Sequence, residues 1–111
     1  MKIDLEIETF DKKLDFDLFE TKERLERGMT KQLENGVSLE YKGTEIRLGV
    51  GFPDIILLVL DIASSVAVGL FVSWLYDKLK NRATKIKINE IEVEIDKEEI
   101  KKLLIRQIER Q

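Results

Sequence analysis

The sequence predicts an α+β fold in which antiparallel β-hairpins pack on a long hydrophobic central helix and on an amphipathic C-terminal helix. Three observations lead to this prediction. Short stretches alternate apolar and polar residues, a long central run is almost free of charge, and the last segment spaces its apolar residues as a helix does. A chain of 111 residues has room for one hydrophobic core, so we expect a single domain over residues 1–111.

The first element is a strand over residues 2–9, where aliphatic side chains alternate with acidic ones. The next stretch is ambiguous, because Leu14, Phe16 and Leu18 alternate as in a strand while Asp17 and Glu20 form the ends of a helix capping box. We favour a helix over 18–34, since apolar residues recur there at four-residue spacing and Asn-Gly follows as a stop signal.

A β-hairpin is expected after this helix. Residues 37–41 alternate, Lys42-Gly43 supplies a tight turn, and Ile46 and Leu48 alternate on the far side. Asp54 then stands where the N-cap of the next helix would be. The sequence therefore predicts a turn of the chain between this hairpin and a helix over 54–81.

The apolar run from Ile55 to Tyr76 is the dominant feature of the sequence, and Asp61 is its one charged residue. We expect this helix to be buried in a soluble domain. The alternative is a small single-span membrane protein, because residues 55–76 are long enough to cross a bilayer and Lys78 to Arg82 would then mark the cytoplasmic side.

Small residues form a stripe on the predicted central helix, with Ser65, Gly69 and Ser73 four residues apart. Small side chains let two backbones approach closely, so the stripe favours either self-association or packing on the domain's own sheet. Asp61 must be paired, protonated or in water. The hypothesis for an interaction site comprises Asp61, Ser65, Gly69, Ser73, Trp74 and Ile105.

The C-terminal segment predicts a hairpin over 85–95 and a helix over 97–110. Alternating runs meet at Asn89-Glu90, which shifts the apolar parity as a two-residue turn does. Asp96 and Glu99 form a capping box ahead of the helix. The buried face of this helix is expected at Ile100, Leu103, Leu104 and Ile108. Ile105 lies off that face, as the fringe of the core or as a partner contact.

Composition restricts the function classes. The chain has no histidine and no cysteine, so the usual general base, the commonest metal ligands and the thiol nucleophile are missing. A net charge of −3 gives no reason to bind a phosphate backbone. We therefore expect no enzyme activity, no cofactor, no metal and no nucleic acid, and a protein partner or a homo-oligomer in the cytoplasm. High Glu and Lys content is typical of thermophiles.

The order of features in the C-terminal half also carries a family resemblance. The features are a hydrophobic helix with small residues, Trp74-Leu75 with Leu79, the basic residues Lys78, Lys80 and Arg82, the hairpin over 85–95, and a short amphipathic helix. This order resembles the effector-associated constant components of prokaryotic conflict systems. The resemblance implies a non-catalytic adaptor that couples a sensor or protease module to a toxic effector, and it implies no catalytic residue.

Overall fold

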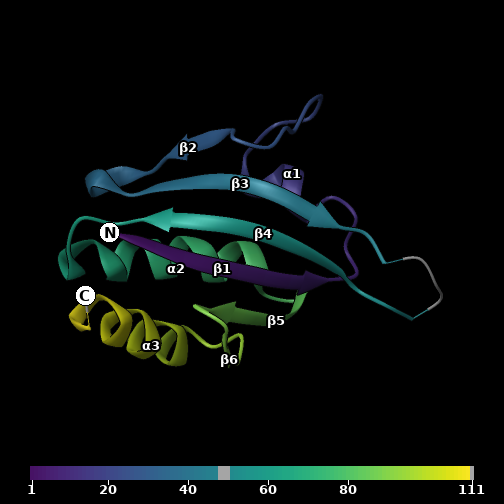
Figure 1. Cartoon of the computed structure of the whole chain (residues 1–111). Helices are drawn as coiled ribbons and strands as arrows, with labels where there is room; N and C mark the ends of the chain where they lie inside the picture. The colour runs from purple at the N-terminus through teal and green to yellow at the C-terminus, as the bar shows by residue number, and fades with distance from the viewer. Residues whose placement is uncertain (48–50, 111) are drawn as a thin grey trace.

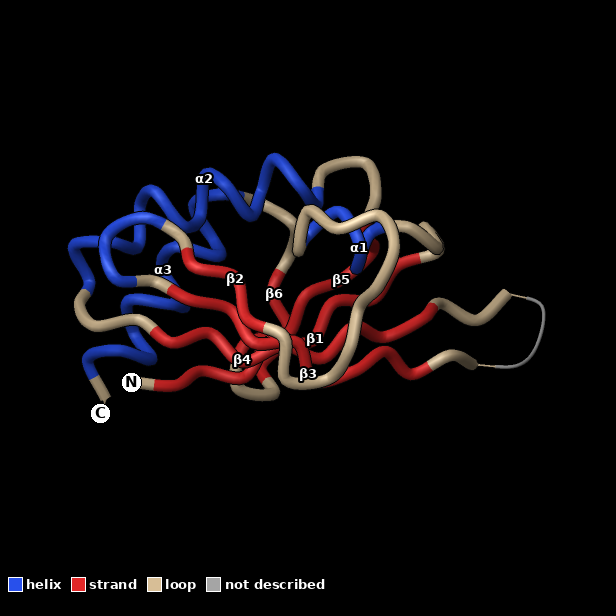
Figure 2. The backbone as a smooth tube through the Cα atoms, turned by 90° about the horizontal axis from the view of Figure 1, so that it is seen from above, coloured by secondary structure: helices blue, strands red, loops and turns tan. Residues whose placement is uncertain are grey.

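The computed structural model describes residues 1–47 and 51–110. Within these ranges, the strands form one antiparallel six-stranded sheet in the order β2-β3-β4-β1-β5-β6. The helices lie on one face of this sheet, so the molecule has two layers (Figures 1 and 2). The predicted α+β class is confirmed.

Long strands occupy the centre of the sheet and short strands its edges. The central strands are β1 (Lys2–Thr9), β3 (Ser38–Glu45), β4 (Asp54–Asp61) and β5 (Ala83–Ile88), and the edge strands are β2 (Thr30–Gln32) and β6 (Ile91–Val93). The helical layer contains α1 (Leu14–Leu18), α2 (Val68–Leu79) and α3 (Lys97–Glu109), with 3-10 turns η1 (Glu34–Gly36) and η2 (Ser65–Ala67).

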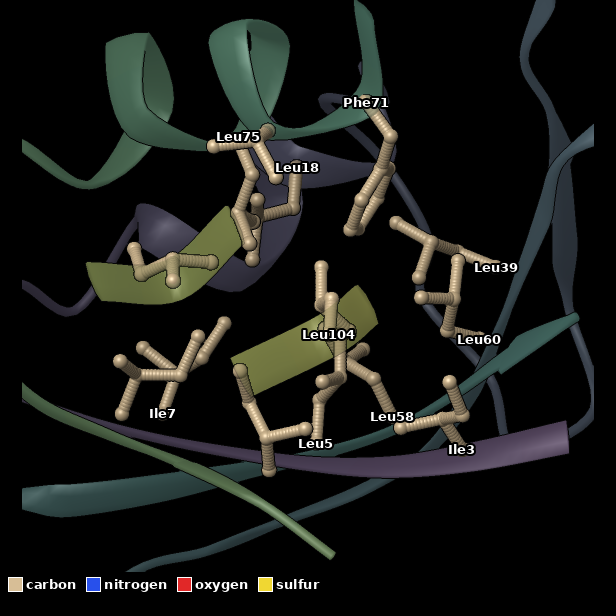
Figure 3. Close-up of a cluster of buried hydrophobic side chains, with 14 of the residues drawn as sticks. Ile3, Leu5, Ile7, Leu18, Leu39, Leu58, Leu60, Phe71, Leu75 and Leu104 are labelled. Carbon is tan, nitrogen blue, oxygen red and sulfur yellow. The ribbon is translucent and has the colours of Figure 1, made fainter. Parts of the chain in front are cut away.

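The hydrophobic core lies between the sheet and the helices. Every second residue of β1 points toward the helices, and these side chains meet Leu18 of α1, Leu75 of α2 and Leu104 of α3 (Figure 3). All three leucines are fully buried. Burial of apolar surface in this layer is the main stabilising force of the fold.

The predictions for the two ends of the chain are confirmed. The first strand spans the predicted residues, and β5 and β6 form the expected hairpin. Its turn residues Asn89 and Glu90 have φ angles of 48° and 69°, as a primed two-residue turn requires. Helix α3 begins at the predicted cap, where the Asp96 carboxylate accepts a hydrogen bond from the Glu99 N–H (3.0 Å).

The predicted central helix over 54–81 is wrong. Its first part is β4, which lies between β1 and β3, and only its second part is the helix α2. The side chains of β4 alternate between buried ones under the helices and half-buried ones on the opposite face of the sheet. The half-buried positions Ile55, Leu57 and Val59 are apolar as well, so periodicity cannot distinguish this strand from a buried helix.

The membrane alternative depended on a continuous helix over 55–76, which the structure divides between β4 and α2. Among the described residues, no helix combines the length and the apolar character needed to span a bilayer.

The predicted helix over 18–34 is also wrong. Helix α1 starts earlier, at Leu14, and ends after five residues. Glu20 follows at a φ of 53° and Gly28 has a φ of 92°, and left-handed residues of this kind interrupt a helix. The expected apolar contacts still form, because Leu25 and Leu33 pack against the core from irregular segments.

The hairpin turn predicted at Lys42-Gly43 is replaced by a bulge within one continuous strand, β3. Gly43 has a φ of 127° and its backbone lies so close to Arg27 that a Cβ atom would stand 3.0 Å from the guanidinium Nε. Leu48, on the far side of the predicted hairpin, lies outside the described residues. Asp54 does not cap a helix: it begins β4, and its buried carboxylate is paired with Lys12 (2.8 Å).

Candidate functional site

A groove of about 490 Å³ lies between α2 and the β2 edge of the sheet. Three sections of the chain line it. These are Glu20, the segment Lys31, Gln32, Leu33 and Glu34 with Val37, and Leu70, Phe71 and Trp74 from α2. Apolar side chains therefore come from the helix and from the β2 side, while charged side chains stand at the rim.

The aromatic wall of the groove follows from the spacing of α2. Phe71 is buried against the sheet, and Trp74 lies three residues further along the helix, partly buried at the side of that face. Their ring centroids are 6.2 Å apart at an interplanar angle of 31°. Lys78, one helical turn beyond, places its Nζ 6.0 Å from the centroid of the Trp74 ring.

An ion-pair cluster lies at the groove, and two of its three members, Glu20 and Lys31, line it. Lys31 Nζ lies 3.0 Å from Glu20 Oε2, and Lys78 Nζ lies 3.9 Å from Glu20 Oε1. The hydrogen bond from Lys31 holds the pKa of the Glu20 carboxyl below its ordinary value. At neutral pH this carboxylate is therefore ionised, and the cluster combines one negative charge with two positive charges.

The outer face of α2 continues the apolar surface beyond the groove. Val66 in the preceding turn is 89% exposed and Leu70 is 58% exposed, the first and third highest values among the large apolar side chains described. A Cβ atom built on Gly69 would meet no other atom within 4 Å. This part of the helix is therefore uncovered by the chain itself.

The small-residue stripe lies on this outer face. Ser65 and Gly69 are exposed and Ser73 is half-buried, and Trp74 beside them lines the groove. The interpretation that the stripe accommodates the domain's own sheet does not hold at Gly69, which faces open space. The structure thus brings four of the six predicted interaction residues together.

The other two predicted residues lie elsewhere. Asp61 ends β4 and its carboxylate accepts a hydrogen bond from the N-terminal amino group of Met1 (3.1 Å) while remaining 49% exposed. Ile105 of α3 is partly buried against the core. Neither lines the groove.

Sequence reasoning missed Leu70, Val66 and the entire β2 side of the groove. The spacing of Val66, Leu70 and Trp74 at four residues carried a signal, since a helix of ordinary length on a sheet buries only one face. Lys31 and Leu33 gave no such signal. They are far from α2 in the sequence and were assigned to a helix.

A second hollow next to α3 has a different character. It is shallow and lined by Glu92, Val93, Glu94, Asp96 and Glu99. In the part of the chain that the structure describes, no group of three or more acidic, histidine or cysteine side chains is arranged to hold a metal ion.

The chain was compared with protein-family models, with curated proteins and with solved structures, and none of the three comparisons found a match. The functional argument therefore rests on the geometry of the groove and of the outer face of α2.

Proposed function

We propose that this chain is a non-catalytic component that binds another protein through the groove and the outer face of α2. The observation that carries the proposal is the exposure of Val66 and Leu70 directly beside a groove that contains Trp74. Contiguous exposed apolar side chains next to an aromatic pocket are typical of protein-binding surfaces. The resemblance to adaptor components of conflict systems supports the same function.

The chemistry of the groove supports binding rather than catalysis. The sequence contains no histidine and no cysteine, and Glu20, one of the two acids that line the groove, is paired with two lysines. These groups can fix the orientation of a partner at the rim while the apolar walls supply the binding energy. The absence of cysteine fits a reducing compartment, and we propose that the interaction occurs in the cytoplasm.

Site-specific photocrosslinking in the cells that naturally produce the chain tests this function. A benzophenone amino acid is placed at Leu70, on the outer face of α2, and in a matched variant at Arg106, an exposed position of α3. We expect a discrete protein adduct from position 70 and none from position 106. Identical adduct patterns from the two positions, or no adduct from position 70, would contradict the proposal.

A substitution provides a second test of the proposed function. Leu70→Glu places a charge in the apolar surface and should abolish the adduct from a benzophenone at Val66. The same change at Arg106 should leave that adduct in place. Because both side chains are exposed, we expect each substitution to change the unfolding free energy by no more than about 0.5 kcal/mol. Circular dichroism and urea denaturation check that both variants remain folded.

A further inference from the structure

We propose that the partner binds as an extended strand added to the free edge of β2, with alternate side chains entering the groove. This inference rests on the proposed function and specifies its partner as an extended polypeptide segment. Strand addition of this kind draws its affinity from backbone hydrogen bonds and its specificity from pockets for every second side chain.

The direction of the β2 backbone groups is fixed by its pairing with β3. Leu33 N–H donates to the Val37 carbonyl (2.7 Å), and Tyr41 N–H donates to the Met29 carbonyl (2.8 Å). In an antiparallel pair, every second residue points its N–H and C=O to the partner strand and the intervening residues point theirs away. The N–H and C=O groups of Thr30 and Gln32 therefore face outward.

These outward groups form a free row at the edge of the sheet. Strand β2 is the last strand on its side and pairs only with β3. No backbone hydrogen bond from the described residues reaches the N–H or C=O of Thr30 or Gln32. An added strand offers donors and acceptors at the matching spacing.

The side chains of an added strand would alternate between two environments. Residues directly opposite each other in the sheet point to the same face. Thr30 lies opposite Glu40, Glu40 opposite Val59, and Val59 opposite Asp4. The Asp4 side chain is exposed on the face without helices, so the Thr30 side chain points to that face as well. We propose an antiparallel addition, in which the partner residue that bonds to Thr30 or Gln32 lies directly opposite it and places its side chain on the same polar face. The next partner residue points the other way, into the groove beside Leu33, Leu70 and Trp74.

The chemistry of the partner segment follows from these two environments. It carries polar residues at the positions that bond to β2 and bulky aliphatic or aromatic residues at the positions between them. The rim of the groove has acidic Glu20 and Glu34 and basic Lys31 and Lys78 nearby, so it selects no strong net charge.

The charge of β2 disfavours a second copy of the same strand as the occupant. In a two-fold pairing that joins Thr30 of one copy to Gln32 of the other, the two Lys31 side chains lie directly opposite each other. Like charges at such positions are destabilising. The other free edge, β6, is a poorer site because Glu92, Glu94 and Asp96 surround it with negative charge.

Trp74 makes the proposal directly measurable, because it is the one tryptophan of the sequence and it lines the groove. The probes are blocked heptapeptides of the pattern Lys-Thr-Z-Thr-Z-Thr-Lys, in which both Z positions are Val, Leu, Ile or Phe. We expect at least one of them to shift the Trp74 emission to shorter wavelength in a saturable titration against the full chain. No shift with any of the four peptides at millimolar concentration overturns the proposal.

Backbone methylation of the best peptide separates strand addition from general apolar binding. Methylation at the central threonine removes an N–H that points to β2 and should weaken binding by about tenfold or more. Methylation at a Z residue alters an N–H that points away from β2 and should change affinity by less than about threefold. Equal losses from the two peptides, or a tenfold loss only from the Z-methylated one, would overturn the inference.

A protein variant provides the reciprocal test. Gln32→Pro removes one outward N–H at an edge position, where proline is tolerated, and should weaken peptide binding, whereas Gln32→Thr should not. If Gln32→Pro fails to fold, the methylated peptides still decide the question. Sedimentation of the full chain alone completes the test. A concentration-dependent dimer that blue-shifts Trp74 would show a second copy in the groove and overturn the inference.

The proposed function has its own readout, so the two failures are distinguishable. A discrete adduct from position 70 combined with no peptide binding would retain the protein-binding function and reject strand addition. No adduct from position 70 would reject the protein-binding function itself.

Discussion

Helices α2 and α3 pack on the same face of the sheet, yet their outer faces differ in character. Both bury leucines against the strands, with Leu75 in α2 and Leu104 in α3 fully buried. The outer face of α3 carries charged side chains such as Lys102 and Arg106, whereas that of α2 and its preceding turn exposes Val66, Gly69 and Leu70. Folding requires only the inner faces, so the apolar outer face of α2 needs a separate explanation, and the proposed protein binding would supply one.

Truncating a buried leucine on the inner face of either helix should destabilise the fold to a similar extent, and this is the largest expected effect. Leu75→Ala and Leu104→Ala each remove a fully buried side chain, and each should lower the unfolding free energy by about 2–5 kcal/mol. Urea denaturation of the two variants measures the losses. A loss below about 1 kcal/mol in either variant would mean that its helix does not contribute to the core as described.

The sequence predicted α3 correctly and α2 only in part, for a physical reason. In α3, Asp96 marks the start, and charged residues separate Ile100 from the next buried positions, so periodicity and capping agree. In the central run, Ile56 and Leu58 are buried under the helices, and Ile55, Leu57 and Val59 are apolar although they lie half-buried on the opposite face. The sequence there is uniformly apolar and carries no period.

The candidate site could be predicted on its helical side only. Gly69 stood out from the four-residue spacing of small residues, because residues four apart are neighbours on a helix, and Trp74 was part of the same predicted interaction site. Lys31 and Leu33 reach the groove through the pairing of β2 with β3 and of β3 with β4, and that pairing is long-range. Such contacts depend on sheet order, which single-sequence periodicity does not specify.

The ends of the two helices are also held differently, and the C-terminal end of α2 should be sensitive to acid. Arg82, just beyond α2, donates to Asp11 (2.7 Å) and to Asp17 (2.6 Å). The hydrogen bond from Arg82 holds the pKa of Asp11 below its ordinary value of 3.8. Arg82→Met should therefore lower the unfolding free energy at neutral pH by about 1–2 kcal/mol, a range reduced for partial exposure.

The pH dependence of this effect has a definite sign. A carboxyl group whose pKa is depressed in the folded state contributes stability that is complete above its ordinary pKa and is lost as pH falls through the folded-state pKa. The difference between the parent and Arg82→Met should thus shrink below the ordinary value of 3.8. Urea denaturation from about pH 7 to about pH 2.5 measures it. A difference that stays constant, or that grows in acid, would exclude the Asp11 pairing as its source.

The N-terminal ends of α2 and α3 provide a smaller contrast. Asp96 caps α3 through a side-chain hydrogen bond, whereas Ser64 and Ala67 make no side-chain cap at η2 and α2. Asp96→Ala should lower the unfolding free energy by about 1 kcal/mol, and Ser64→Ala should change it by less than about 0.3 kcal/mol. Thermal denaturation of the pair checks this. Equal losses of unfolding free energy at the two positions would show that the Asp96 side chain does not stabilise α3 as a cap.

Gly69 gives the smallest expected effect on stability and the sharpest test of the comparison. Because it is the second residue of α2 and has open space around its Cβ position, Gly69→Ala should raise the unfolding free energy by about 0.5 kcal/mol, the lower end of the range for a helix interior. Lys102→Ala on the outer face of α3 should change it by less than about 0.5 kcal/mol. Loss of stability in Gly69→Ala would mean that part of the chain covers this position.

Gly69→Leu separates folding from binding at the same position. A leucine is a good helix former, so circular dichroism should show an intact helix, while the adduct from a benzophenone at Val66 should be lost because the longer side chain holds the partner away from the helix backbone. An adduct of parental yield from Gly69→Leu would place the partner away from this position. Folding alone favours leucine over glycine at this position. If Gly69→Leu gains stability but loses the adduct, Gly69 matters for the partner rather than for the fold.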